Sequence, residues 1–223
     1  MRKGMEAFSY LLHAFYVCIR APFCIICKLF LLDEQVLCQK CKVGIYPIVS
    51  VSLPITSTKT VQVFAVSEYK NPLKRLILSK GSINKSAAMH LGEIMWSMSS
   101  IQNQSFDYIV PIPLHWTRFA WRGYNQAAEI AKIISKKSGK PMINALKRHT
   151  KTKQQSFFSA QDRQKNVKNV FSLTNKYKDI LKDKQILIID DLMTTGATIQ
   201  SAAKMLLEVK PTSIKVLVAC RVR

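Results

Sequence analysis

The stretch at residues 186–203, ILIIDDLMTTGATIQSAA, decides the fold. An apolar run ends in Asp190 and Asp191, a turn follows at 194–198, and the next residues have the periodicity of a helix. In open α/β sheets, ligands bind outside the carboxyl ends of the parallel strands. This strand, turn and helix therefore predict a ligand site at the two aspartates.

The two halves of this segment favour different parts of a ligand. The turn offers hydroxyls, a glycine and the N–H groups of a helix start, which together favour a phosphate; these residues are Thr194, Thr195, Gly196, Ala197 and Thr198. The two carboxylates would repel a phosphate, so we expect them to accept hydrogen bonds from sugar hydroxyls or to hold Mg²⁺. A ribose 5-phosphate carries a phosphate and a diol at this separation. A solvated acidic turn that caps a helix is the alternative.

Other phosphate motifs do not fit the chain. It has neither the G-x-x-x-x-G-K-[ST] loop of nucleoside triphosphatases nor the G-x-G-x-x-G of dinucleotide folds. A response-regulator receiver carries its paired acids near its start, whereas Asp191 lies close to the end of this sequence.

The rest of the chain alternates strand and helix patterns. Strands are predicted at 61–69, 106–114, 184–190 and 213–220, and helices at 72–81, 86–100, 122–140 and 197–209. Strands that alternate with helices predict a parallel sheet covered on both faces. Residues 45–60 are expected to lead out of an N-terminal module, and the first half of 146–169 is expected to be a mobile loop.

Four of the six cysteines form the pattern C-x2-C-x10-C-x2-C: Cys24, Cys27, Cys38 and Cys41. Four thiolates can close a tetrahedral zinc site, which would be structural because no position is left for a substrate. Two disulfides or chance pairs of buried cysteines are the alternatives. Cys18 and Cys220 lie outside the pattern, and we expect both to be buried apolar residues.

Composition indicates a packed protein with a basic surface. The chain has 223 residues, 48% of them hydrophobic, and a formal net charge of +21. Such a charge attracts polyanions, among them nucleic acid, phosphorylated metabolites and anionic membranes. No apolar run reaches the length of a spanning helix, so we expect a cytoplasmic protein without a membrane span. The N-terminal segment favours an amphipathic helix over a signal peptide.

Several of these segments together resemble those of a known protein family. Residues 186–198 closely resemble the phosphoribosyl pyrophosphate (PRPP) signature of type I phosphoribosyltransferases. The whole chain resembles the ComF family of competence-associated proteins, which join a four-cysteine zinc module to such a domain. The resemblance includes EYKNPLKRLILSKG at 68–81, VPIPLHWTRFAWRGYNQA at 110–127 and several later positions: Arg148, Gln154, Arg163, Asn166 and Phe171.

The resemblance implies a fold and a site. The fold is a type I phosphoribosyltransferase with a five-stranded parallel core, helices on both faces and a small hood, at 51–223, after an N-terminal helix and zinc ribbon at 1–50. Asp190 and Asp191 would hold the ribose hydroxyls and serve in catalysis, and residues 194–198 would hold the 5-phosphate. The loop 111–115, with Pro113, would lie beside the pyrophosphate, and Arg148 begins a flap that would close over it.

The resemblance also implies cofactors and partners. Mg²⁺ would bind together with PRPP, because pyrophosphate leaves readily only when its charge is neutralised. The candidates for the contact of the flap with pyrophosphate are Lys147, Arg148, Lys151 and Lys153, and a solvated surface cation is the alternative for each. No residue stands out as the base that would activate a ribosyl acceptor. Relatives are linked to uptake of transforming DNA and to a competence helicase.

A second hypothesis is a catalytically inactive module that binds single-stranded DNA or a helicase. The segment HWTRFAWRGYNQ at 115–126 interleaves aromatic and arginine side chains, a mixture suited to stacking bases. Burial in the core is the alternative for its Trp and Phe residues. The fold by itself does not establish turnover.

Overall fold

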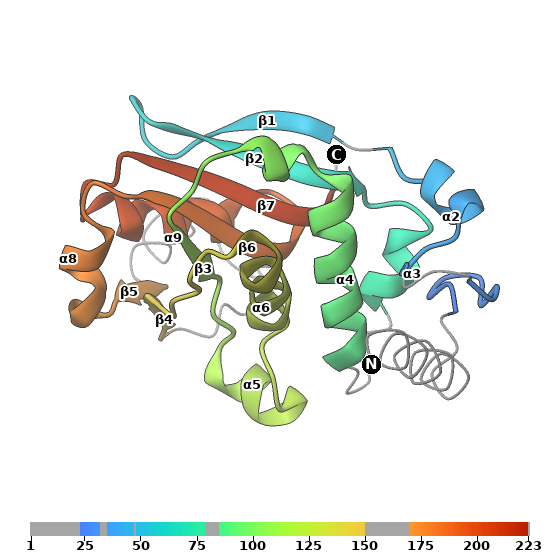
Figure 1. The fold of residues 1–223 in the computed structure, drawn as a ribbon. Helices are drawn as coiled ribbons and strands as arrows, with labels where there is room; N and C mark the ends of the chain where they lie inside the picture. The colour runs from blue at the N-terminus through green and yellow to red at the C-terminus, as the bar shows by residue number, and fades with distance from the viewer. Residues whose placement is uncertain (1–22, 32–34, 47, 79–84, 150–169, 223) are drawn as a thin grey trace, which may run out of the picture. The chain divides into compact units, whose positions relative to one another are not determined.

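The computed structural model describes residues 23–31, 35–46, 48–78, 85–149 and 170–222 (Figure 1). The chain divides into two compact units, Met1–Ile45 and Tyr46–Arg223. The first contains the short helix α2 (Gln39–Val43), and the second contains a five-stranded sheet with its helices. Among the described residues, no helix combines the length and the apolar character that crossing a membrane requires.

The sheet of the second unit has the order β1-β2-β7-β6-β3. The strands are β1 (Ile48–Pro54), β2 (Thr60–Glu68), β3 (Tyr108–Pro111), β6 (Gln185–Met193) and β7 (Ser213–Arg221). The pairs β2–β7, β7–β6 and β6–β3 are parallel, which confirms the predicted α/β class.

One edge of this sheet corrects two expectations. The strand β1 pairs antiparallel with β2, so only four of the five strands are parallel. Residues 45–60 were expected to be a connection between modules, but Ile48–Pro54 forms a strand. The reason is local: Val51 and Leu53 alternate with exposed serines, which suits a half-buried edge strand. A tight turn, in which Ile55 N donates to Lys59 O at 2.8 Å, returns the chain into β2.

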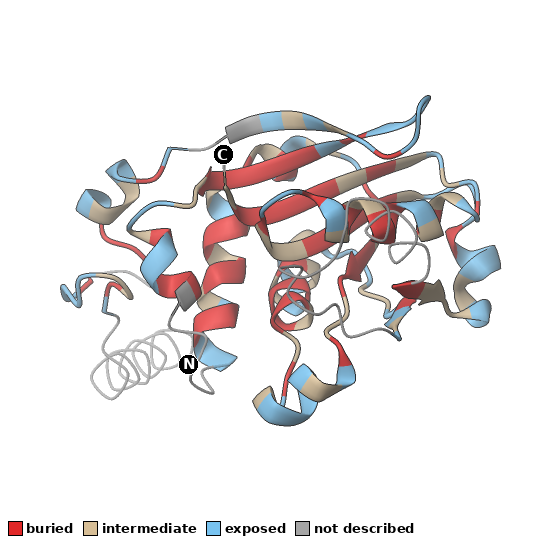
Figure 2. Ribbon diagram, turned by 180° about the vertical axis from the view of Figure 1, so that it is seen from behind, coloured by how far each residue is buried: buried red, intermediate tan, exposed pale blue. Residues whose placement is uncertain are grey.

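The two central strands are buried on both faces. The four residues 186–189 of β6 are fully buried, as are residues 216–220 of β7, so these strands are continuous apolar runs (Figure 2). Successive side chains of a strand point to opposite faces. Ile186 and Ile188 belong to the core cluster that includes α9 (Ala197–Leu207), so Leu187 and Ile189 face the other layer.

The helices α4 (Lys85–Met98) and α6 (Gln126–Ser138) lie on the face of the sheet opposite α9 (Figure 1). They pack closely at Gly92, where an added Cβ would lie 2.9 Å from the Ile133 Cβ. The predicted helix at 122–140 ends as expected at Gly139, which is left-handed with φ +71°. The shorter helices are α3 (Leu73–Leu78), α5 (Trp116–Arg122), α8 (Lys178–Leu181), η2 (Ser100–Asn103) and η3 (Asn175–Tyr177).

A separate two-stranded sheet pairs β4 (Leu146–Arg148) with β5 (Phe171–Leu173). The sequence predicted a loop from residue 146, and β4 corrects that start: its backbone pairs with β5, and Leu146 and Phe171 enter the core cluster. Lys151 and Lys153, named for the flap, lie outside the described residues, as do Gln154, Arg163, Asn166 and Cys18. Cys220 is fully buried, as predicted.

Candidate functional site

Asp190 and Asp191 are half-buried and lie near the end of β6. The strand was predicted to stop at the aspartates but continues to Met193, because Leu192 and Met193 still pair with Cys220 and Arg221 of β7. Asp190 Oδ1 accepts a hydrogen bond from Asp191 N at 2.8 Å. Alternation along the strand gives Asp190 the face of Ile188 and Asp191 the face of Ile189, so the two carboxylates lie on opposite faces of the sheet.

The turn after β6 opens a helix without a side-chain cap. Gly196 is the N-cap of α9, with φ +80°, a left-handed conformation that favours glycine. Gly196 has no side chain that could accept from the first helical turn, so the N–H groups of this turn beyond Ala197 are suited to bind a ligand. Thr194 and Thr195 are exposed beside them, and Thr195 Oγ1 accepts a 3.4 Å bond from Ala197 N. This is the geometry of an anion site.

Strand β1 supports this turn, which the sequence did not reveal. A Cβ added at Gly196 would lie 2.9 Å from Leu53 Cδ1, so a side chain at this position would both strain the backbone angle and displace the end of the Leu53 side chain. Gln200 Nε2 of α9 donates to Pro54 O at 2.8 Å. The contact joins residues far apart in the chain, and only the pairing of β1 in the sheet brings them together.

Arg148, at the end of β4, is close enough to Asp190 for their charges to interact. Burial, followed by the positive charge of Arg118, lowers its pKa from the ordinary value, and the negative charge of Asp190 acts the other way. These effects place Arg118, Arg148 and Asp190 within electrostatic range of one another. The guanidinium of Arg148 also lies 5.5 Å from the centre of the Phe171 ring. Arg118 was noted in the sequence only as part of an aromatic and basic segment.

The loop after β3 lies beside β6. Ile112 N donates to Ile189 O at 2.9 Å, which puts the loop carrying Pro113 next to the strand of the two aspartates. Asn125 ties the far end of this connection back to the loop, because its Nδ2 donates to Ile112 O at 3.0 Å. The N-cap of α6 is therefore held against the start of the loop.

The helix α5 stands between this loop and α6, and its aromatic side chains are exposed. Trp116 and Trp121 are each 69% exposed and Phe119 is 50% exposed, so burial in the core is not their role. Tyr124, just after the helix, is buried. The sequence did not predict this helix. His115 caps its start by accepting from Thr117 N, and Gly123, with φ +74°, ends it.

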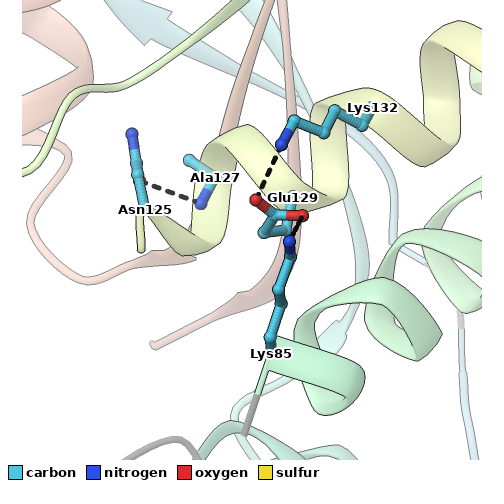
Figure 3. Close-up of polar contacts among 5 residues, drawn as sticks. All are labelled: Lys85, Asn125, Ala127, Glu129 and Lys132. Atoms are coloured by element: carbon cyan, nitrogen blue, oxygen red, sulfur yellow. Dashed lines mark hydrogen bonds and ion pairs between the residues drawn. The ribbon is translucent and has the colours of Figure 1, made fainter. Parts of the chain in front are cut away.

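The first turn of α6 is held by a buried carboxylate (Figure 3). Asn125 Oδ1 accepts from Ala127 N at 3.1 Å, which caps the helix. Glu129, 7% exposed, lies 2.9 Å from Lys132 Nζ and 3.6 Å from Lys85 Nζ of α4. A negative charge in a first turn is stabilising, and here it also links α6 to α4.

In the first unit, the four predicted cysteines come together as expected. The sulfurs of Cys24, Cys27, Cys38 and Cys41 all lie within 4.8 Å of one another. Cys27 Sγ and Cys38 Sγ are 3.6 Å apart, close to the about 3.8 Å that two sulfurs subtend in a tetrahedral zinc site. Cys38 Sγ also accepts a 3.4 Å bond from Cys41 N. The residues fit a structural zinc site of the ribbon type.

The acidities of these thiols differ within the cluster. Burial by itself raises the pKa of Cys24, but backbone N–H groups of Ile26, Cys27 and Cys38 lower it to about 6. Burial and the neighbouring thiols raise the pKa of Cys41. The shifts of Cys24 and Cys41 thus have opposite directions within one cluster.

Comparison with known proteins places this architecture. Residues 83–223, more than half of the chain, match the model of the phosphoribosyl transferase domain. The DNA utilization protein YhgH of Escherichia coli strain K12 is 32% identical over 164 residues, which cover 70% of each chain. The chain belongs to the ComF family of type I phosphoribosyltransferases.

Other members of the family match more partially. Competence protein F of Haemophilus influenzae is 36% identical over 99 residues, 44% of this chain and 43% of that protein. The matched part thus spans less than half of the length of that relative.

Among solved structures, the glutamine PRPP amidotransferase of Bacillus subtilis, complexed with ADP and GMP, is 18% identical, with a TM-score of 0.43, over 60% of this chain and 26% of that one.

Proposed function

We propose that the protein binds PRPP together with Mg²⁺ at the turn between β6 and α9, and that it acts as a phosphoribosyltransferase in the uptake or use of DNA in the cytoplasm. The names of its relatives, competence protein F and DNA utilization protein, support the second part. The ribosyl acceptor has no counterpart in any motif of the chain.

The observation that carries the proposal is the combination of two half-buried carboxylates with an uncapped helix start. The left-handed Gly196 exposes the N–H groups of α9 a few residues after Asp190 and Asp191. In the proposed complex, residues 194–198 hold the 5-phosphate and the two carboxylates accept hydrogen bonds from the ribose hydroxyls. Charge-assisted bonds of this kind are about twice as strong as neutral ones.

The remaining residues act on the pyrophosphate. The loop with Pro113 lies beside the strand of the aspartates, so it can contact the leaving group. Arg148 supplies a cation, and Mg²⁺, when bound with PRPP, neutralises the charge that otherwise keeps pyrophosphate attached. The ribosyl centre becomes positively charged as the bond breaks, and the nearby carboxylates stabilise it electrostatically.

Calorimetric titration of PRPP, with and without Mg²⁺, tests the proposal. Wild type should bind in the presence of Mg²⁺, and Asp190→Asn and Asp191→Asn should weaken binding strongly. Asp179→Asn, which removes an exposed acid on α8, is the charge-matched control and should bind like wild type. The absence of PRPP binding by wild type would refute the enzymatic function.

A second candidate function is the binding of single-stranded DNA, with or without a helicase partner, and the helix α5 favours it. Its three exposed aromatic rings accompany two arginines in a chain of net charge +21. Aromatic residues that stack bases contribute about 1 to 3 kcal/mol per base. Trp121→Ala should therefore weaken DNA binding at least about fivefold. Tyr46→Ala, which removes a similarly exposed aromatic ring elsewhere, should not. Equal losses for both variants would contradict a specific role of α5.

We further propose that the four cysteines bind a structural Zn²⁺. Metal analysis of protein purified without chelator should find one zinc per chain, and Cys38→Ser should lose it. Cys220→Ser changes a buried cysteine outside the cluster and should keep the metal. Zinc-free wild-type protein would refute the site.

A further inference from the structure

The turn between α5 and α6 contains buried hydrogen-bonding groups without partners. Within the described part of the chain, the atoms Arg122 Nε, Tyr124 OH and Gln126 Nε2 are buried and make no hydrogen bond. Gln126 is 3% exposed and Tyr124 is 7% exposed. An unmade hydrogen bond of a buried group costs about 1 to 3 kcal/mol, so three in one turn require an explanation.

This turn also carries a positive charge without a negative partner. Arg122 Nη1 donates to Gln126 Oε1 at 2.8 Å, which holds the guanidinium beside the first residue of α6. The start of a helix carries a partial positive charge, so a cation there is unfavourable unless an anion accompanies it. Arg122 makes no ion pair with any residue that the structure describes.

The acid in the first turn of α6 does not supply that anion. Glu129 is engaged by Lys85 and Lys132 (Figure 3). Its charge is felt at Tyr124, whose pKa is raised mainly by burial, with Arg122 acting in the opposite direction. The carboxylate is thus balanced by two lysines, and the positive charge of Arg122 is left over.

The orientation of the Gln126 amide is determined by its neighbour. An arginine only donates hydrogen bonds, so the amide oxygen must face Arg122 and the amide N–H₂ group must be the unpartnered end. All three free groups can therefore donate to a ligand. Arg122 and Asn125 are half-buried and Gly123 is exposed, so the turn borders solvent.

We propose that Arg122, Tyr124 and Gln126 form a second phosphate-binding site, which takes the phosphate of a nucleotide ligand other than PRPP. Guanidinium, hydroxyl and amide donors beside a helix start are complementary to a phosphate. The exposed rings of α5, which end at the residue before Arg122, offer a surface on which the base of the same nucleotide stacks. The site does not depend on PRPP binding at the other turn, and either proposal can fail alone.

Two sources of this phosphate share the chemistry, a free nucleotide and a DNA strand. The probes are thymidine 5′-monophosphate and a short oligothymidylate, each titrated into the full chain and compared with PRPP and Mg²⁺. Arg122→Gln should weaken at least one of the two thymidine probes about tenfold and leave PRPP unchanged. If the strand is the ligand, the dependence of its affinity on salt should also fall by about 0.7 in log–log slope.

Gln126→Glu is the sharper variant, because it supplies the missing anion from within the protein. The new carboxylate accepts from Arg122 and lies at the positive end of α6, so the melting temperature should rise. Binding of the thymidine probe should be lost at the same time. Lys204→Gln, which removes an exposed cation from α9, is the control for net charge. It should leave the melting temperature unchanged and change the affinity for the thymidine probe by no more than about twofold.

Two outcomes would overturn the proposal. If Arg122→Gln and Gln126→Glu weaken PRPP as much as the thymidine probes, the turn belongs to the PRPP site and no second site exists. If Gln126→Glu raises the melting temperature and leaves the affinity for every phosphate ligand unchanged, the turn is structural only.

Tyr124→Phe removes a single hydroxyl with little risk to folding. It should weaken the binding of the same thymidine probe by a smaller factor than Arg122→Gln.

Discussion

Two helices, α9 and α6, begin beyond the carboxyl ends of neighbouring parallel strands, and their first turns are built in opposite ways. The N-cap of α9, Gly196, has no side chain, so the main-chain N–H groups of the first turn beyond Ala197 are suited to bind a ligand. The start of α6 is capped by Asn125, and donors from side chains surround it instead. The start of α9 can therefore recognise a phosphate through the backbone alone, whereas phosphate binding at the start of α6 depends on the identity of three side chains.

The largest effect on this comparison should come from placing a side chain at Gly196. Gly196→Ala combines a left-handed backbone with a contact to Leu53, and we expect a loss of about 1 to 3 kcal/mol in unfolding free energy and of PRPP binding. Chemical denaturation and calorimetry measure the two effects. Gly139→Ala has the same backbone strain with nothing within 4 Å, so it should cost about 1 kcal/mol and spare binding.

Adding Leu53→Ala to Gly196→Ala separates the two causes. It removes the contact and leaves the strained angle, so part of the lost stability should return. If the double variant is no more stable than Gly196→Ala, the contact with Leu53 of β1 does not contribute to the loss of stability.

The next effect should come from the carboxylates that precede the same turn. Asp190→Asn removes one charge and keeps the shape of the side chain, and PRPP affinity should fall about 10- to 100-fold while the fold persists. Titration calorimetry measures the affinity, and circular dichroism checks the fold. An unchanged affinity would show that the strand end plays no part in binding.

A smaller effect is expected at the capped helix start. Asn125→Ala removes the acceptor for Ala127 N and the donor to Ile112 O, and it should lower the unfolding free energy by about 1 to 2 kcal/mol. Asn125→Asp keeps the acceptor and loses the donor, so it should cost less. If Asp costs as much as Ala, the bond to Ile112 and not the cap stabilises the turn.

The smallest effect should come from the ion pairs behind α6. Glu129→Gln removes the charge shared by Lys85 and Lys132 and should cost about 1 kcal/mol, less at high salt. Glu93→Gln breaks the more exposed pair with Lys137 and is the matched control, with a still smaller cost. Equal costs for the two variants would mean that the burial of Glu129 adds nothing.

The two turns also differ in how far the sequence predicted them. Around α9, the glycine, the threonines and the aspartates are adjacent in the chain, so local chemistry was enough to predict a strand, a phosphate turn and a helix there. The four cysteines were predictable for the same reason, since their spacing is short. In both places the functional groups are close in space because they are close in sequence.

What the sequence did not predict depends on distant contacts. Leu53 touches Gly196 only because β1 joins the sheet, and β4 pairs with a strand on the far side of 150–169. The unpartnered donors at Arg122 and Gln126 are recognisable only when burial and hydrogen bonds are known together. The continuation of β6 beyond the aspartates likewise follows from its pairing with β7.

The position of β7 has a consequence for how the protein is made. This last strand lies between β2 and β6, and Gln62 pairs with Lys215 near the opposite end of the chain. During synthesis, β2 and β6 have no shared partner until the residues of β7 have left the ribosome. Pairings of such large sequence separation form slowly. Removal of β7 should therefore leave β2 and β6 without the strand that joins them, whereas β3 and β6, which lead to the two helix starts, can still pair with each other.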